Sequence, residues 1–180
     1  MAVLNYNCTA LGDHERVSCG NYKVGGSSAI AIVEADHTVT DWTSASEWNS
    51  NITNNKIHLV EGIKAMLPEP SPVEGEAAVG AGPETVLDSF NYEITYKDFN
   101  VTSSNIDFYN ALNERRFYVV VFHDEDSEIT VNDVYECNAV ARSVTPELVS
   151  EKRHFLITIK FTGKDILPVY TAPTGVFNQD

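Results

Sequence analysis

The sequence is poor in positive charge, in cysteine and in long apolar runs. It has 12 lysines and arginines against 26 acids, and a net charge of −14 over 180 residues. Proteins that bind nucleic acid need lysine and arginine to neutralise phosphates, so specific binding to DNA, RNA or an anionic membrane is not expected. No apolar run reaches the roughly 20 residues of a transmembrane helix. Acidity also has a plainer meaning, because a high net charge keeps a protein in solution.

The three cysteines, Cys8, Cys19 and Cys137, are odd in number and irregular in spacing. They predict no disulfide framework, and the absence of a Cys-x-x-Cys pair argues against a zinc site. No signal peptide is recognised at the N-terminus. We therefore expect the chain to mature in a reducing cytoplasm.

The sequence contains no convincing pattern for catalysis or metal binding. One acidic cluster invites a calcium hypothesis; its members are Asp124, Glu125, Asp126, Glu128, Asn132, Asp133 and Glu136. It lacks the central glycine and the final glutamate of an EF-hand loop, so a solvated acidic turn is the favoured interpretation. The five histidines form no His-Glu-x-x-His motif, and Gly163-Lys164 lacks the rest of a phosphate-binding loop. We expect no catalytic residue, no cofactor and no metal.

The stretch that organises the chain is 90–123, which predicts strand, helix and strand. Residues 90–97 alternate strictly, with Phe90, Tyr92, Ile94 and Tyr96 on one face, as in a half-buried strand. Residues 117–122 are apolar on both faces, which predicts a central strand.

Between these two strands, Ser104 followed by Asp107 resembles a capping box. Ile106, Tyr109 and Leu112 recur at helical spacing, so they are expected to form the apolar face of a helix. This helix is expected to pack across one face of the sheet.

The other elements are shorter. Further strands are expected at 17–24, 29–33, 57–66, 129–131, 134–141 and 155–162, with a turn at 25–28, a short helix at 43–51 capped by Thr43, and an extended tail at 167–180. Ile57, Leu59 and Ile63 are expected on one side of their strand. The sequence thus predicts a single domain over 1–180 of mainly-β or α+β class: an antiparallel β-sandwich or small barrel with one helix across a face.

Residues 67–88 break this pattern. The segment contains four of the seven prolines and no lysine or arginine; none occurs between Lys64 and Lys97. The prolines and glycines argue against an internal sheet strand over most of its length, so an extended acidic loop or arm is expected. It is either a plain surface loop or an arm that orders against a neighbouring subunit. The candidate intersubunit residues are Glu69, Glu74, Glu76 and Glu84.

Together these features resemble the structural proteins of tailed bacteriophages, in particular the tail-tube class. The likeness is one of layout: a Gly-Gly turn before the first strand, the acidic arm at 67–88, the strand, helix and strand at 90–123, the alternating strand at 154–162, and the tail at 170–177. The resemblance implies a β-sandwich with a flanking helix, in rings, commonly hexameric, that stack into a tube. It implies location in the virion after assembly in the host cytoplasm, and contacts with other virion proteins. The family has no catalytic motif, so no functional residue is carried over.

An acidic chain suits such a tube, because DNA sliding through a lumen lined with carboxylates is repelled rather than bound. Two alternatives stay open. One is a phage neck, ring or capsid-decoration protein of similar length. The other is a β-sandwich binding module, for instance for carbohydrate, with Trp42 and Trp48 as an exposed aromatic platform.

Overall fold

The computed structural model describes residues 27–79, 82–123, 128–147 and 151–176. These ranges contain eight strands and two helices, in the order β1 (Ser27–Glu34), α1 (Ala45–Thr53), β2 (Ile57–Ala65), β3 (Ser71–Val79), β4 (Gly82–Asp98), α2 (Ser103–Asn113), β5 (Phe117–His123), β6 (Glu128–Val144), β7 (His154–Gly163) and β8 (Val169–Thr171). The predicted strand at 17–24 lies outside the described residues, and so do Gly25 and Gly26 of the predicted turn.

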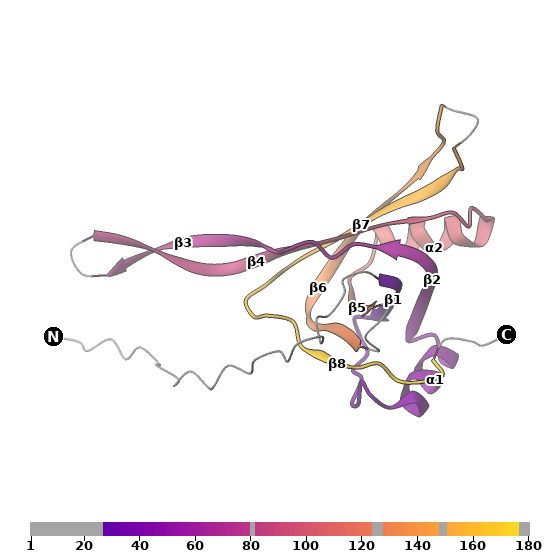
Figure 1. Ribbon diagram of the computed structural model, residues 1–180, viewed down its shortest axis with the longest axis horizontal. Helices are drawn as coiled ribbons and strands as arrows, with labels where there is room; N and C mark the ends of the chain where they lie inside the picture. The colour runs from indigo at the N-terminus through magenta and orange to yellow at the C-terminus, as the bar shows by residue number, and fades with distance from the viewer. Residues whose placement is uncertain (1–26, 80–81, 124–127, 148–150, 177–180) are drawn as a thin grey trace, which may run out of the picture.

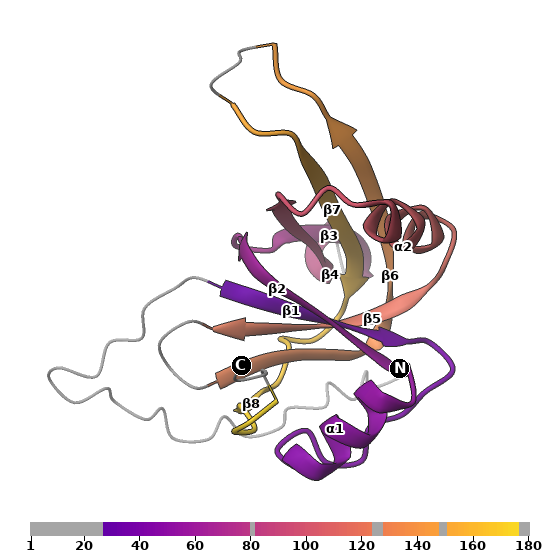
Figure 2. The same cartoon turned by 90° about the vertical axis from the view of Figure 1, so that its right-hand side faces the viewer.

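All pairings in the sheet are antiparallel, and the strand order is β2-β1-β5-β6-β7-β4-β3, with β8 beside β6. The first part of β6 pairs with β5 and the last part pairs with β7, so this one strand passes from one half of the sheet to the other. The sheet thereby folds over itself into a sandwich, which Figures 1 and 2 show from two sides. It stays open, because β2 and β4 meet only at the isolated bridge between Met66 and Thr95. The predicted sandwich with a packed helix is confirmed.

The first core lies between the two layers of the sandwich. Inward residues of β4 and β7 meet there, among them Tyr96, Ile157 and Ile159, all fully buried. The alternation at 90–97 and 155–162 that predicted these strands is confirmed. Helix α2 closes this core with Tyr109 and Leu112.

The second core lies on the opposite face of β1, β5 and the start of β6. Trp48 of α1 packs there against Trp42 and Phe122, with ring centroids 5.7 and 5.4 Å from its own. Since β1 and β5 contribute to both cores, they are buried on both faces. The prediction that 117–122 is a central strand is confirmed by its place between β1 and β6.

Residues 67–88 do not form a loop. Ser71–Val79 and the first part of Gly82–Asp98 pair residue by residue, apart from one register shift, into a long two-stranded ribbon, β3–β4, that projects from the body (Figure 1). The expected surface loop is wrong, but the prolines are compatible with this ribbon, because each of its strands has one free edge and neither is an internal sheet strand there. A proline there need not break a ladder hydrogen bond.

The helix caps also differ from the prediction. Thr102, not Ser104, caps α2 by accepting a hydrogen bond from the Asn105 amide, and Ile106 is 43% exposed rather than part of the core. Ser44, not Thr43, caps α1. In both cases the neighbouring hydroxyl in the sequence was an equally good candidate, and propensity alone does not choose between them.

Two strand predictions fail at bulges. Gly62 has a φ of +67°, the left-handed region that glycine adopts without strain, and the β1–β2 register shifts beside it. Ile63 therefore joins the first core, while Ile57 belongs to the second. Similarly, 129–131 and 134–141 are one strand, β6, whose pairing to β5 shifts between Phe117 and Val119.

The buried thiol and phenols make stability fall at alkaline pH. Burial raises the pKa of Cys137 from 9.0 to about 12, and burial likewise raises the pKa of Tyr96 and Tyr109. Above pH 9 the unfolded chain loses the Cys137 proton while the folded chain keeps it, so the free energy of unfolding should fall by about 1.4 kcal/mol per pH unit. Above pH 10 the buried tyrosines lower the free energy of unfolding further, for the same reason.

Urea unfolding from pH 7 to 11 measures this decline in the free energy of unfolding, and Cys137→Val should delay its onset to pH 10. A free energy of unfolding that stays constant to pH 11 would contradict the assignment.

Candidate assembly surface

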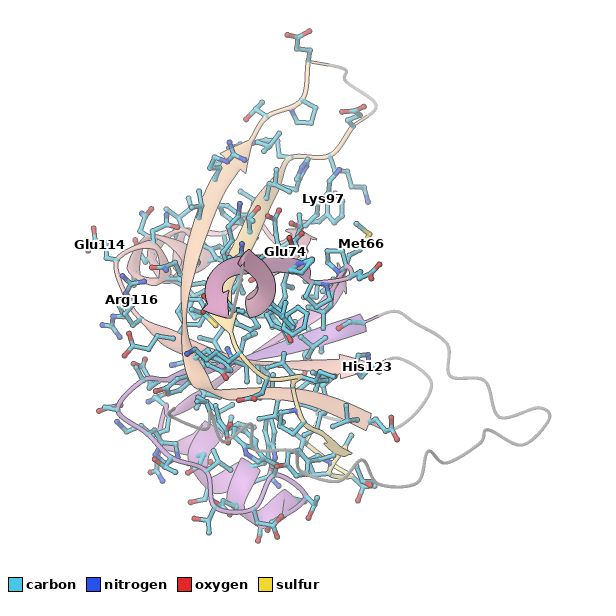
Figure 3. All side chains as sticks on the ribbon, turned by 90° about the vertical axis from the view of Figure 1, so that its left-hand side faces the viewer. Met66, Glu74, Lys97, Glu114, Arg116 and His123 are labelled. Carbon is cyan, nitrogen blue, oxygen red and sulfur yellow. The ribbon has the colours of Figure 1, made fainter. Side chains whose placement is uncertain are left out.

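The candidate intersubunit residues all lie on or beside the β3–β4 ribbon. Glu69 is exposed in the connection before β3. The backbone of Glu74 and Glu76 lies in β3, and that of Glu84 lies in β4 opposite Ala77. The structure thus places three of the four residues in the ribbon and the fourth, Glu69, in the connection that leads into it. Figure 3 looks along the ribbon, with Glu74 labelled.

One face of the ribbon pairs an acid with an exposed aliphatic side chain. Glu74 lies directly opposite Leu87, and residues opposite each other in an antiparallel pair share a face. Leu87 is 55% exposed and Glu74 is exposed. None of the described side chains of residues 68–89 belongs to either core. The described side chains of the ribbon therefore make no core contact with the body, and their surface is available to another molecule.

The ribbon also has two unpaired backbone edges within the described part of the chain. Strand β3 ends the strand order, and β4 pairs with β7 only from Phe90 onward. Unpaired strand edges are templates for pairing with another chain. In an isolated subunit this length of free edge is a liability.

A second free edge belongs to β2. Its outer side opens into a groove of about 960 Å³ between α1 and the start of α2, whose lining includes Asn49, Leu59, Glu61 and Asn105. Most of the surface of the groove is polar. The outer backbone edge of β2 has no strand partner among the described residues apart from the bridge at Met66.

Two ionisable groups of this groove, Asp98 and His58, are engaged in structural contacts. The two oxygens of Asp98 accept hydrogen bonds from the Asn100 amide at 2.7 Å and from the Tyr109 hydroxyl at 2.8 Å. These bonds tie the end of β4 to the first turns of α2. The carboxylate is buried, and each of its oxygens accepts a hydrogen bond from the protein itself.

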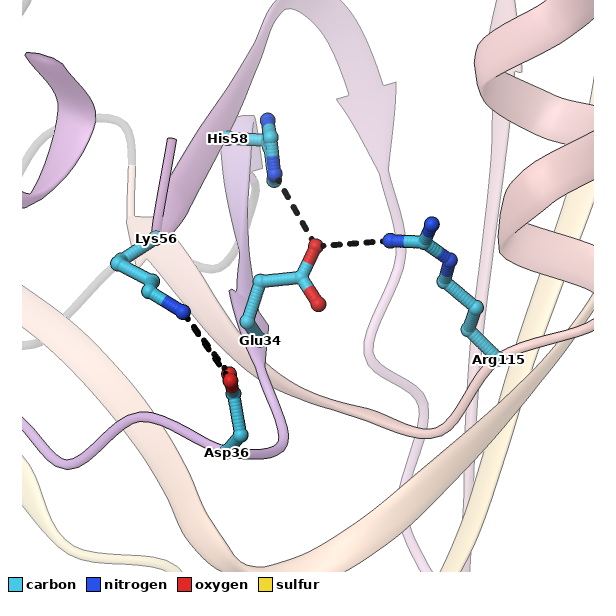
Figure 4. Close-up of polar contacts among 5 residues, drawn as sticks. All are labelled: Glu34, Asp36, Lys56, His58 and Arg115. Atoms are coloured by element: carbon cyan, nitrogen blue, oxygen red, sulfur yellow. Dashed lines mark hydrogen bonds and ion pairs between the residues drawn. The ribbon is translucent and has the colours of Figure 1, made fainter. Parts of the chain in front are cut away.

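His58, which also lines the groove, faces Glu34 instead. Figure 4 shows Glu34 between His58, at 3.4 Å, and Arg115, at 3.3 Å, next to the ion pair of Lys56 with Asp36. These contacts join β1, β2 and the connection after α2. Largely exposed ion pairs of this kind contribute at most about 1 kcal/mol each, so their role is to fix the geometry of the edge.

The described residues include no group of three or more histidine, cysteine, aspartate or glutamate side chains placed to hold a metal ion. Of the acidic cluster, Glu128, Asn132, Asp133 and Glu136 are described, while 124–127 lie outside the described residues. Asn132 bonds the backbone of Tyr135, and Asp133 accepts from the Trp42 indole at 3.1 Å, so two of the proposed oxygen ligands serve the fold.

Trp42 and Trp48 do not form a surface platform. They are 5% and 0% exposed, and the Trp48 indole donates to the Trp42 carbonyl at 2.9 Å. The binding-module alternative requires an exposed aromatic pair, and these two candidates do not supply it, because both rings fill the space between α1 and the sheet.

Searches for related proteins give no further guide. No family model, no curated protein and no solved structure matches this chain. In the described ranges, neither helix is long and apolar enough to span a membrane.

Proposed function

We propose that this chain is a structural subunit of a tailed-bacteriophage virion that forms closed rings, stacked into a tail tube around a DNA conduit. The observation that carries the proposal is the β3–β4 ribbon, an acidic arm with free edges and an exposed apolar side chain that makes no core contact in its own chain. The sandwich, with α1 packed on the second core and α2 closing the first, supplies a compact body from which such an arm can reach a neighbour.

The distribution of acids supports an acidic lumen at the α1 end of the body. Asp36, Asp41 and Asp133 are exposed there, with Glu47 beside them and Lys56 as the nearby base. Hydrogen bonds from Thr43 lower the pKa of Asp41, which keeps this carboxylate charged. Six copies at −14 carry −84 formal charges, and a wall of such carboxylates repels phosphate and gives DNA nothing to bind.

A salt series tests the ring. Like charges oppose assembly, and the Debye length of about 8 Å at physiological salt screens carboxylates across a wide bore. Moderate salt should therefore promote rings, and low salt should favour monomers. Native mass spectrometry gives the number of subunits, and electron microscopy shows whether rings stack.

The outcomes separate the alternatives. Stacked rings of about six subunits support the tail tube, whereas single rings that never stack favour a neck protein. A strict monomer at every salt and protein concentration would contradict ring formation altogether. A lumen lined with lysine and arginine would contradict the charge argument even if rings form.

A further inference from the structure

The outer face of the β4–β7–β6 layer is an uncovered sheet surface. The residues that point away from the first core are exposed or half-buried along all three strands, while their neighbours Tyr96, Ile157 and Ile159 are buried. The pairing register places Thr95, Thr158 and Val140 in one row across this face. Met66, bridged to Thr95, extends the row. Met66 and Val140 are 63% and 54% exposed, so the row has an exposed aliphatic side chain at each end.

This face is basic although the chain is strongly acidic. The same register places Lys97, Leu156 and Arg142 in one row and Glu93 and Lys160 in another. Glu93 pairs with Lys160 at 2.9 Å, while Lys97 and Arg142 have no ion-pair partner among the described residues. Three bases against one acid leave an excess of two positive charges on a surface of a protein whose net charge is −14. We call this surface the basic face.

The basic face and the ribbon are complementary. The ribbon carries acids and no base, and presents Leu87 beside Glu74; the basic face carries Lys97 and Arg142 beside Val140. Each surface therefore combines an exposed aliphatic group with charges of one sign, opposite to that of the other surface.

The two surfaces cannot meet within one chain. Strand β4 is continuous from Gly82 to Asp98, so it forms one strand of the ribbon and then one strand of the basic face. The ribbon points away from the face that β4 goes on to build (Figure 1). Complementary surfaces on one molecule that cannot touch each other can only be satisfied between copies, in a head-to-tail contact.

We propose that the basic face is the docking surface for the β3–β4 ribbon of a second copy of this chain. The proposal rests on the proposed function, since it names where the arm of one subunit binds the next. Lys97 and Arg142 meet the acids of the incoming ribbon, and Val140 and Met66 cover its exposed leucine. The contact is heterologous, so it closes into a ring or continues as a stack according to the rotation it imposes.

Because this contact is between opposite charges, it makes assembly sensitive to high salt as well as to low salt. At low salt the net charge keeps the copies apart, and at roughly 1 M salt the Debye length of about 3 Å also weakens the pairs between ribbon and basic face. Assembly should therefore pass through a maximum at intermediate salt and decline above it.

Charge reversal tests the contact on the full chain. The face variant carries Lys97→Glu and Arg142→Glu, and the ribbon variant carries Glu69→Lys and Glu74→Lys. All four side chains are exposed. Each variant alone should raise the dissociation constant of assembly roughly 100-fold, since like charges then face each other. A matched control with Lys152→Glu and Arg153→Glu makes the same change in net charge as the face variant at exposed sites near the β6–β7 turn, and should assemble nearly as well as the unmodified chain.

Mixing distinguishes this contact from a general effect of charge. The face variant keeps an intact ribbon and the ribbon variant keeps an intact basic face, while the reversed ribbon is complementary to the reversed face. Equal amounts of the two should therefore assemble together in a 1:1 ratio in sedimentation velocity experiments, although neither assembles alone. All four substitutions in one chain should restore assembly. If the unmodified chain forms rings and the face variant forms them equally well, this docking surface is wrong while the proposed function stands. If the unmodified chain is a monomer under all conditions, both fail.

Discussion

Replacing residues 74–88 with a two-residue Asn-Gly turn should give a folded monomer that no longer assembles. Val73 and Ser89 are paired across the ribbon, so a tight hairpin turn can join them there. The described side chains that are removed belong to neither core, and the strand from Phe90 onward keeps its pairing to β7. The melting temperature should change little, while the dissociation constant of assembly rises at least about 100-fold, because the main contact of the arm is lost.

The matched control shortens the other projecting hairpin. Val144 and His154 are paired at the end of β6 and β7, so an Asn-Gly turn in place of 145–153 removes a tip of similar kind without touching the ribbon. This variant should still form rings by native mass spectrometry. Rings that survive removal of the ribbon would show that the sheet edges alone drive assembly, and a variant that unfolds would show that the ribbon supports the body.

The ribbon also shows where inference from sequence stops. The prolines argue against a central strand, where every amide is needed for the ladder, and do not distinguish an edge strand from a loop. Pro72 and Pro83 lie in β3 and β4 opposite Phe90 and Ala78, and no local feature of the sequence says that this hairpin stands alone with free edges. The strands at 90–97 and 155–162 were predictable because one face of each is buried, which imposes the period of two.

The basic face was beyond prediction for a different reason. Lys97 and Arg142 are 45 positions apart in the sequence, and only the register of β4 against β7 and of β7 against β6 places them in one row. The composition indicates an acidic chain, but a net charge is an average over the whole surface of the protein. Where the few bases gather depends on strand pairing, and pairing is a tertiary property that no local pattern encodes.

The second large effect is expected for Trp48→Ala, which should lower the free energy of unfolding by about 3–5 kcal/mol. Trp48 is fully buried, packs edge-on against Trp42 and Phe122, and donates its indole N–H to the Trp42 carbonyl. Alanine leaves a large cavity and an unsatisfied carbonyl in the second core. Since whole domains are stable by only about 5–15 kcal/mol, much of the folded population should be lost near physiological temperature.

Urea unfolding, followed by tryptophan fluorescence and by circular dichroism, measures this loss, with Ile166→Ala as the control. Ile166 is 84% exposed, so its truncation should change the free energy of unfolding by less than about 0.5 kcal/mol. The same experiment bears on function. A tryptophan that served as an exposed binding platform could be removed at almost no cost in stability, whereas one that holds α1 against the sheet cannot. A stability loss below about 1 kcal/mol would contradict the second core and reopen the binding-module alternative.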